Sequence, residues 1–479
     1  MTERFRVEKD FLGTMEISES AYYGIQSARA KDNFPITGIM LHSQLIIAIA
    51  KVKQAAAKAN RDVGALKPEI AEAISKACQD IIEKRLHDNF IVDVIQGGAG
   101  TSINMNANEV IANRALEILG HAKGEYKIIH PNIHVNMSQS TNDVFPTAIK
   151  IASFMLCQSL LKVLKMLTAT IKDKAEEFDE VLKMGRTHLQ DAVPIRLGQE
   201  FRAWSRMLER DFQRIKGSMQ ELLEINLGAT AVGTGLNADP KYTALVLEHL
   251  REGTKLDLLR AEDLIDATQN TDVYVEVSGK LKTLAGNLSK IANDLRLMSS
   301  GPRTGLNEIN LPALQPGSSI MPGKVNPVIP EVVNQVAFQV AGNDQTISRA
   351  AEAGQLELNV MEPVMAFNLL QSLDILHNVI KVFELKCIRD ITANKERCNE
   401  MVETSVGILT AINPHVGYEI ASMIAKEAIT TGRPIREIIL EKGVLKEDEL
   451  DCILCPFEMT EPGIACKELL EGKKPVKKQ

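Results

Sequence analysis

The chain has 479 residues and a formal net charge of −7, with 62 acidic against 55 basic residues. Hydrophobic residues make up 45% and charged residues 24% of it, a balance that is typical of a globular protein and excludes a disordered or fibrous chain. The acidic charge disfavours nucleic acid as a partner, because the one basic cluster is the C-terminal GKKPVKKQ.

The length suggests about three domains or one large helical assembly. No apolar run approaches a membrane-spanning segment, so we expect no membrane partner. The start, MTERFRVEKDFLG, lacks the apolar stretch of a secretory signal. These features predict a cytoplasmic protein.

Seven cysteines are scattered along the chain, and such an odd, dispersed set predicts reduced thiols rather than a disulfide framework. Cys452 and Cys455 form a CxxC pair whose nearest further candidate ligand is Cys466, and no histidine follows His415. We therefore expect no zinc site there, and the sequence predicts neither a metal nor a cofactor.

The N-terminal part is expected to be a mixed, mostly helical domain over residues 1–141. Aromatic residues are only 4% of the chain, and the dominance of Ala, Leu, Ile, Val and Met favours helices. The pattern predicts one helix over about 44–59 and another over about 68–85, followed by glycine-rich and polar stretches.

Residues 142–395 carry long apolar stripes at steps of three and four residues, which is the spacing of amphipathic helices. These stripes run over 197–222, over 277–298 in heptad alternation, and over 369–387 after Pro363 has ended or kinked what precedes it. Helices of this length bury their stripes against antiparallel neighbours or other subunits. The sequence therefore predicts a central domain built as a long-helix bundle.

From about Thr392 the apolar pattern shortens and is punctuated by glycine and proline. We expect a small helical C-terminal domain over 396–479, ending in a disordered basic tail. The predicted fold class is mainly α.

Four polar, glycine-bearing segments interrupt this pattern. They are GGAGTSINMNANE (97–109), HPNIHVNMSQSTNDVFPT (130–147), GRTHLQDAVP (185–194) and GSSIMPGKVNP (317–327). Each alone is also what helix caps and turns are made of. Together they offer hydroxyls, amides, a histidine and a lysine, which suits a small dicarboxylate. Acidic residues are sparse in them, so a divalent-metal cage is not expected.

The fourth segment has the composition of a mobile lid, with two glycines, two prolines, adjacent serines and a lysine. Two residues are candidates for a general base. His188 has the natural pKa for the task and could be oriented by Glu331. Ser318 could act if backbone N–H groups, Lys324 and the exclusion of water favoured its alkoxide.

GSSIMPGKVNP resembles the hallmark loop of the fumarase/aspartase superfamily of homotetrameric lyases. The other three segments and GPRTGLNEINLP (301–312) resemble family segments in the same order and spacing, so the resemblance covers nearly the whole chain. GGAGTS, STND and LNEINLP are closer to the aspartases than to the fumarases. The resemblance implies a three-domain, mainly α fold with a multi-helix core in a homotetramer.

It also implies reversible deamination of L-aspartate to fumarate and ammonia through an enediolate intermediate, with hydration of fumarate by a class II fumarase as the alternative. In this scheme Ser318 is the base, and the side-chain carboxylate is held by Thr101, Ser140, Thr141 and Ser319. Asn142 and His188 contact the amino group, while Thr187, Lys324 and Asn326 bind the other carboxylate. Segments of three subunits build each site. A non-catalytic role, like that of lens proteins related to this superfamily, is disfavoured by intact Ser318, His188 and Lys324.

Overall fold

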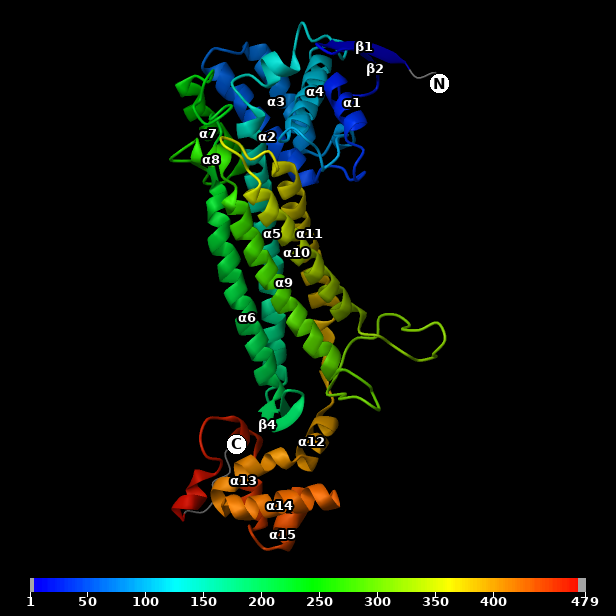
Figure 1. The fold of residues 1–479 in the computed structure, drawn as a ribbon, viewed down its shortest axis with the longest axis vertical. Helices are drawn as coiled ribbons and strands as arrows, with labels where there is room; N and C mark the ends of the chain where they lie inside the picture. Colours follow the sequence, from blue (N-terminus) through cyan, green and yellow to red (C-terminus); the bar gives the residue numbers. More distant parts are fainter. Residues whose placement is uncertain (1–3, 473–479) are drawn as a thin grey trace. The chain divides into compact units, whose positions relative to one another are not determined.

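The computed structural model describes residues 4–472, and within them the chain is mainly helical (Figure 1). The strands of this part form only two-stranded sheets. The chain divides into two compact units, each assembled from three separate segments. Unit 1 comprises the residues up to Lys162, Asp211–Ala285 and Val336–His377, and unit 2 comprises Val163–Arg210, Gly286–Gln335 and the residues from Asn378 onward.

The long apolar stripes form long helices, as the sequence predicted. These helices are α5 (Thr141–Glu177), α6 (Leu197–Ser218), α9 (Asp272–Met298), α10 (Val328–Glu352) and α11 (Glu362–Lys386). Pro363 is the second residue of α11. A proline is tolerated in the first turn because no helical partner is needed for its missing N–H, so Pro363 helps to begin this helix.

Unit 1 begins with the antiparallel hairpin of β1 (Phe5–Asp10) and β2 (Gly13–Ser18). Its shorter helices are α1 (Ile25–Asn33), α2 (Ser43–Asp62), α3 (Pro68–Ile82), α4 (Thr101–Ile118), α7 (Pro240–Thr254) and α8 (Asp266–Gln269). Single turns lie at His87–Asn89, Pro131–Val135 and Met219–Leu223, and β5 (Glu224–Ile225) pairs in parallel with β6 (Leu259–Arg260).

Helix α2 is the centre of this unit and packs against α3, α4 and α7 (Figure 1). Its alanines and β-branched residues are buried on several sides, among them Ala48, Val52 and Ala56. Small side chains let the neighbouring helices approach closely. Helices α2 and α3 confirm the two helices predicted over 44–59 and 68–85.

Polar bonds join the long helices within each unit. In unit 1, Ser278 of α9 donates to Asp344 of α10 at 2.9 Å. In unit 2, Asn334 of α10 donates to the Ser289 hydroxyl of α9 at 2.8 Å, and Thr170 of α5 donates to Glu384 of α11 at 2.9 Å. Because buried polar groups need matched partners, these bonds fix the register of neighbouring helices.

Unit 2 contains the antiparallel hairpin of β3 (Leu182–Thr187) and β4 (Gln190–Arg196) and the short pair of β7 (Ile309–Asn310) and β8 (Thr392–Ala393). Its short helices are α12 (Lys395–Thr404), α13 (Leu409–Val416), α14 (Tyr418–Thr431), α15 (Ile435–Glu441), α16 (Glu447–Ile453) and α17 (Pro456–Thr460), with single turns at Ile388–Asp390, Val406–Ile408 and Lys467–Glu471. Leu182 and Met184 of β3 pack into one apolar cluster with Ile412, Ile424 and Ile438.

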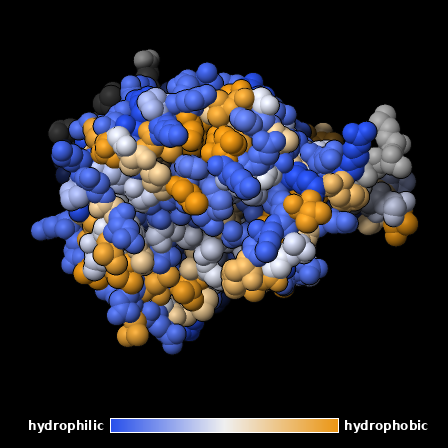
Figure 2. Space-filling model, turned by 90° about the horizontal axis from the view of Figure 1, so that it is seen from above, coloured by the Kyte–Doolittle hydropathy of each residue, from blue (hydrophilic) through white to orange (hydrophobic). Residues whose placement is uncertain are grey.

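Helix α5 corrects the expectation that no apolar run of the chain approaches the length and hydropathy of a membrane-spanning segment. Its 37 residues include an 18-residue window of mean hydropathy 1.5, which is long and apolar enough to cross a membrane by length and composition. Within the structure 78% of that window is buried, as in the core helix of a globular protein. On the face shown in Figure 2, hydrophilic residues predominate and hydrophobic ones are interspersed among them.

The cysteines bring a second correction. Cys452 of α16 forms a disulfide with Cys466, with their Cα atoms 5.9 Å apart, a separation usual for such bonds. The expectation of reduced thiols throughout was therefore wrong for this pair. The spacing of the cysteines along the chain did not reveal that the fold brings Cys452 and Cys466 together. Cys455 stays free. The division at 1–141, 142–395 and 396–479 stays a prediction, and most of the expected disordered tail lies outside the described residues.

Candidate active site

The first candidate group lies at the start of α5, where Ser140 caps the helix. The Ser140 hydroxyl accepts from the backbone N–H of Asn142 at 3.2 Å, and the Asp143 carboxylate accepts from the Ser140 N–H at 3.0 Å. Together these two bonds cap the helix start and satisfy backbone donors that it would otherwise leave open. The cap fixes the backbone at Thr141 and Asn142.

Asp143 also ties this helix start to the loop after β5. Its second carboxylate oxygen accepts from the backbone N–H groups of Gly228 at 3.1 Å and Thr230 at 3.0 Å. Burial raises the pKa of Asp143 to about 6, although these hydrogen bonds and the charge of Lys53 act in the opposite direction. The carboxylate is therefore ionised only above slightly acidic pH.

Asn142 is held in one orientation by the same loop. Its side-chain N–H donates to the Ala231 carbonyl at 2.7 Å, and its backbone carbonyl accepts from Asn226 at 3.0 Å. With its amide N–H bound in this way, the side-chain oxygen is left as an acceptor. An acceptor is what a substrate ammonium group would need at this position.

Thr101 begins α4 close to the first turns of α5. Gly100, the residue before it, has φ +85°, and a Cβ there would lie 2.4 Å from the Phe145 ring of α5. Only glycine combines that backbone conformation with such close contact. The starts of α4 and α5 therefore lie against each other, and each carries the positive end of its helix dipole, which favours negative charge nearby.

A buried amide network supports these helix starts from behind. The side-chain oxygen of Asn136 accepts from Lys53 at 2.8 Å, from Asn104 at 3.1 Å and from Asn108 at 3.2 Å. Lys53 is fully buried, and burial lowers its pKa to about 7. Asn136 thus connects α2 and α4 to the segment that leads to Ser140.

In unit 2, Thr187 and His188 lie at the tip of the β3–β4 hairpin. His188 and Leu189 form its turn, with φ of 55° and 60°, which is uncommon for residues other than glycine. Both Thr187 and His188 are exposed, and within residues 4–472 the His188 ring has no hydrogen-bond or ion-pair partner. The hairpin therefore presents these side chains unbound.

The loop after β7 carries the remaining candidates and is closed at its base. The Gly317 N–H donates to the Lys324 carbonyl at 2.7 Å, and the Asn326 side chain donates to the Gly317 carbonyl at 2.9 Å. A Cβ on Gly317 would lie 2.7 Å from the Asn326 nitrogen, so a larger residue would open this closure. Asn326 keeps one amide N–H for a ligand.

Within this closed loop, the Ser318 hydroxyl oxygen accepts from two backbone N–H groups. The donors are Ile320 at 3.2 Å and Met321 at 3.1 Å. Ser319 and Lys324 are exposed, and the Lys324 ammonium has no partner among the described residues. Two amide donors on one oxygen favour its ionised form.

The structure thus gathers the candidates into two sets. Unit 1 holds Thr101, Ser140, Thr141 and Asn142 at two adjoining helix starts, and unit 2 holds Thr187, His188, Ser318, Ser319, Lys324 and Asn326 in a hairpin turn and a closed loop. No cluster of His, Cys, Asp or Glu suited to a metal occurs in the described part.

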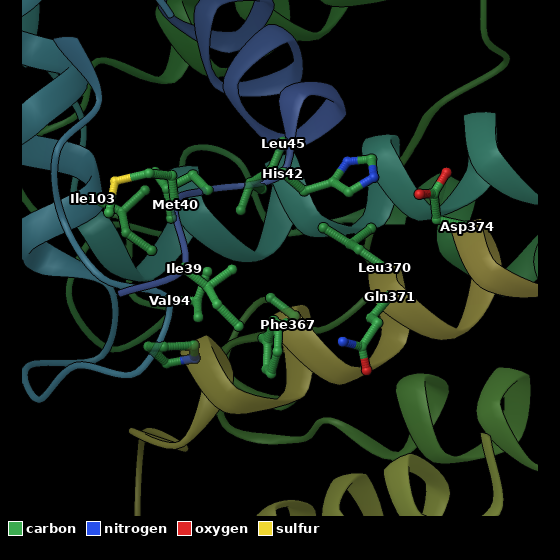
Figure 3. A pocket seen from close by; sticks show the side chains of 13 residues that line it. Ile39, Met40, His42, Leu45, Val94, Ile103, Phe367, Leu370, Gln371 and Asp374 are labelled. Atoms are coloured by element: carbon green, nitrogen blue, oxygen red, sulfur yellow. The ribbon is translucent and has the colours of Figure 1, made fainter. Parts of the chain in front are cut away.

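A separate apolar cavity of about 190 Å³ in unit 1 lies apart from these candidates (Figure 3). Its lining includes Ile39, Ile103, Phe367 and Leu370, with His42 and Asp374 at one end. Burial lowers the pKa of His42. No sequence pattern indicates this cavity, and none of the predicted site residues lines it.

Comparison with known proteins assigns the chain to a family. The lyase family matches residues 13–342, and the family described as fumarase C C-terminus matches residues 408–461. The chain belongs to the fumarase/aspartase superfamily. It is a carbon–nitrogen lyase, because its near-full-length relatives are aspartate ammonia-lyases.

Two relatives and two solved structures show how far the likeness extends. The chain is 62% identical to the aspartate ammonia-lyase of Bacillus subtilis (98% of this chain, 99% of the relative) and 53% identical to that of Helicobacter pylori strain J99 (95% and 98%). A Brucella melitensis fumarate lyase:delta crystallin structure bound to cobalt aligns with a TM-score of 0.93 at 48% identity over 96% of the lyase and 100% of that chain. A class II fumarase from Schistosoma mansoni aligns at 0.90 and 36%, with coverage of 96% and 100%. The predicted fold class is confirmed.

Sequence reasoning missed the residues that hold the candidates in place. Lys53 carried a signal, because it continues the buried face of Ile49 and Val52 on α2 where a lysine is unexpected. Asp143 lay inside a recognised segment, yet its three backbone donors come partly from a distant loop. Lys183, Arg186 and Glu308 meet in the fold of the lyase although the chain separates them widely.

Proposed function

We propose that this lyase removes ammonia from L-aspartate to give fumarate in a reversible reaction, with Ser318 as the base. The substrate follows from relatives named aspartate ammonia-lyase that match the chain almost end to end. The Ser318 role rests chiefly on one observation, the two backbone N–H groups directed at its hydroxyl oxygen.

The proposed first step is transfer of a proton from the carbon next to the side-chain carboxylate to the Ser318 alkoxide. The electron pair of the broken C–H bond moves into that carboxylate, which becomes a dianionic enediolate. In the second step this pair returns to form the carbon–carbon double bond while the C–N bond breaks and ammonia leaves. Ser318 then returns its proton to solvent.

Stabilising the enediolate is the main catalytic task. Thr101, Ser140, Thr141 and Ser319 are the proposed donors, and each preorganised donor contributes roughly 3 to 4 kcal/mol in comparable oxyanion sites. Thr101 and Thr141 begin α4 and α5, so the dipoles of these helices add to the donors.

The remaining contacts orient the amino acid. The free side-chain oxygen of Asn142 and the His188 ring are proposed to bind the amino group. Thr187, Lys324 and Asn326 are proposed to bind the other carboxylate, which the unpaired Lys324 ammonium suits by charge.

His188 is the alternative base, and its surroundings favour it less. A catalytic histidine is normally oriented by a partner on its second ring nitrogen. The His188 ring has no such partner within the described residues, and the Glu331 carboxylate instead accepts from Gln335 at 3.5 Å. Glu331 therefore does not orient His188 within one chain.

We further propose that the lyase is a cytoplasmic homotetramer in which segments of three subunits complete each site. Sedimentation velocity combined with activity assays on the separated species tests this assembly. Activity in a monomer would contradict it.

The decisive experiment is a pair of assays on purified protein. With L-aspartate, ultraviolet absorbance should rise as fumarate forms. Ser318→Ala should lower kcat by at least about 1000-fold, because the proton acceptor is lost, while the oligomer and inhibitor binding persist. Ser319→Ala is the matched control and should lose only a single donor, about 100-fold.

Other outcomes lead to different conclusions. If Ser318→Ala turned over normally and His188→Ala did not, the base would be His188. If wild-type protein were silent with aspartate but converted fumarate to malate, the alternative of a fumarase would replace the proposed reaction.

A further inference from the structure

Three of the seven cysteines belong to the C-terminal helices of unit 2. Cys452 of α16 is bonded to Cys466, and Cys455, which lies between α16 and α17, is a free thiol. The proposed lyase reaction uses none of them. A free thiol beside a disulfide is the arrangement in which thiol–disulfide exchange takes place.

The two bonded cysteines are shielded from solvent, whereas the free one is not. Cys452 is 4% exposed and Cys466 is 0% exposed, and both pack in the apolar cluster that contains Ile412 and Ile438. Cys455 is only half-buried. Because exchange requires a thiolate to reach a sulfur atom, a thiol in solution has poor access to the Cys452–Cys466 bond and better access to Cys455.

The chain between Cys452 and Cys455 forms a tight turn. The Cys455 N–H donates to the Cys452 carbonyl at 3.2 Å. A hydrogen bond of this span closes a turn whose two end Cα atoms lie within about 7 Å of each other, and disulfides join cysteines whose Cα atoms are about 4.4 to 6.8 Å apart. Cys455 is therefore close enough to bond to the Cys452 sulfur with little movement of the backbone.

The segment of Cys466 is held by hydrogen bonds as well as by the disulfide. The Cys466 backbone N–H donates to the Glu458 carboxylate at 2.8 Å, and the His415 ring donates to the Ala465 carbonyl at 2.7 Å. These bonds remain when the S–S bond opens. Cys466 is thus kept near its partner, which makes opening of the disulfide reversible.

We propose that Cys452, Cys455 and Cys466 form a thiol–disulfide exchange site whose substrate is a small thiol, and that Cys455 carries the exchange between the buried bond and solvent. In the first step Cys455 loses its proton, and its thiolate attacks the Cys452 sulfur. A Cys455–Cys452 bond forms while the Cys452–Cys466 bond breaks. Cys466 leaves with the electron pair and takes up a proton, so the protein neither gains nor loses electrons in this step.

The second step is reduction of the relocated bond. The thiolate of one small thiol attacks the Cys455 sulfur, and Cys452 leaves with the electron pair and is protonated. A second small thiol attacks the first at its sulfur and releases Cys455, and the two small thiols depart joined as a disulfide. In total two small thiols are oxidised and one protein disulfide is reduced.

The exchange site couples the C-terminal helices to the surrounding thiols. In the proposed cytoplasmic location small thiols are the expected reductant, because that compartment keeps thiols reduced. The crosslink between α16 and Cys466 then follows the redox state of the small-thiol pool. This inference is independent of the proposed lyase reaction, because none of the three cysteines is a proposed contact of the substrate.

The experiment follows the reduction of the full-length lyase by glutathione. Lyase purified without reductant is mixed with reduced glutathione, samples are quenched with acid and alkylated at low pH, and peptide mass spectrometry identifies the alkylated and the joined cysteines. In wild type we expect an early species in which Cys466 is alkylated while Cys452 and Cys455 are joined, and then glutathione on Cys455. Absence of the joined Cys452–Cys455 species throughout the reduction would overturn the inference. Glutathione that appeared first on Cys452 or Cys466 would do the same.

Variants test the relay by its rate. In Cys455→Ser we expect reduction to be at least about tenfold slower than in wild type, because glutathione must then reach the buried sulfurs directly. Cys455→Ala should behave in the same way. Cys398→Ser is the matched control, since Cys398 is a buried free thiol whose donation to the Glu308 carbonyl at 3.6 Å a hydroxyl can replace. It should be reduced at the wild-type rate.

Two checks separate the relay from effects on folding. The oxidised variants should melt at the wild-type temperature, and the joined species is sought in wild type, where no substitution is involved. Reduction of Cys455→Ser at the wild-type rate would refute the relay, and so would an equal slowing in Cys398→Ser. Purified wild type in which Cys452 and Cys466 were both alkylated before glutathione was added would also refute it, because the exchange starts from their bond.

Discussion

Asp143→Asn tests whether the capped start of α5 supports the proposed roles of Thr141 and Asn142 in substrate binding. The substitution keeps the shape of the side chain but exchanges one acceptor oxygen for a donor. In the lyase the carboxylate accepts from three backbone N–H groups, those of Ser140, Gly228 and Thr230. The oxygen of the new amide can accept from the backbone N–H groups of Gly228 and Thr230. Its NH2 group then faces the N–H of Ser140, so a donor faces a donor and that hydrogen bond is lost.

Two opposing effects set the change in stability. Loss of one hydrogen bond to a charged group costs about 1.5 to 3 kcal/mol. Against this, burial raises the pKa of Asp143 from 3.8 to about 6, so the ionised form carries a penalty of about 3 kcal/mol at about 1.36 kcal/mol per pKa unit. The amide removes that penalty. We expect the unfolding free energy at pH 8 to change by less than about 2 kcal/mol.

Function should respond much more strongly than stability. Without the bond from the Ser140 N–H to the Asp143 carboxylate, the backbone at Thr141 and Asn142 is held less firmly, and we expect KM for aspartate to rise about tenfold or more. In wild-type lyase the same acceptor is lost when Asp143 is protonated, so kcat/KM should fall as the pH drops through about 6. The variant should lack that acidic limb.

The stability of the two proteins should differ with pH in a defined direction. Because the folded-state pKa of Asp143 lies above the unfolded one, the folded state binds more protons between pH 4 and 6. Wild-type stability should therefore fall, relative to the variant, as the pH rises through this window, by up to about 3 kcal/mol. Calorimetric melting at a series of pH values measures the difference.

Glu109→Gln provides the control. The Glu109 carboxylate also accepts from several N–H groups, those of Gly24, Gln26 and Ser27, but it caps α1 and not α5. This variant should keep KM within about twofold of wild type, because its hydrogen bonds support α1 and not the start of α5. If Asp143→Asn kept a normal KM and a normal acidic limb, the assigned role of the cap would be refuted.

Two further predictions concern other buried groups. Burial lowers the pKa of Lys53 from 10.5 to about 7, so the unfolded state binds more protons between these values and wild-type stability should rise with pH there by up to about 1.4 kcal/mol per unit. Lys53→Met should lack this rise in urea titrations at pH 7 to 9, and a parallel pH dependence in both proteins would contradict the burial argument. Cys466→Ser should remove a crosslink with a sequence separation of 14 and lower the stability of the C-terminal helices by about 3 kcal/mol. The rate of limited proteolysis within residues 396–472 measures this effect. Cys455→Ser is the control, and it should be cleaved at the wild-type rate.

The helices of the lyase could be predicted from the sequence because their causes are local. The stripe over 277–298 fixes α9 by its spacing alone, and Pro68 marks the start of α3. The β3–β4 hairpin was missed for an equally local reason. Its turn residues are His188 and Leu189. Two-residue hairpin turns are usually recognised in a sequence by Asn-Gly or Asp-Gly, and neither dipeptide occurs here.

The candidate site residues could also be found in the sequence, but the buried residues that hold them in place could not. Ser318 and Lys324 occur in one contiguous segment with a distinctive composition. Glu308 and Arg186 are 122 positions apart, and nothing local to either residue indicates that they meet. Buried ion pairs of this kind follow from tertiary packing, so a sequence pattern shows each charge without its partner.

The residues that hold the candidate segments in place are hydrogen-bonded or ion-paired, whereas several of the candidate side chains themselves have no partner within the described residues. Backbones at the start of α5, at the hairpin and at the base of the Ser318 loop are fixed by buried carboxylates or by closing hydrogen bonds. The exposed side chains of Thr101, Thr187, Ser319 and Lys324 have no hydrogen-bond or ion-pair partners within residues 4–472. Because the backbones are already fixed, a ligand that bound these donors would have to order only their side chains, which keeps the entropic cost of binding small. The proposed substrate contacts therefore need no rearrangement of the backbone at the start of α5, at the hairpin or at the base of the Ser318 loop.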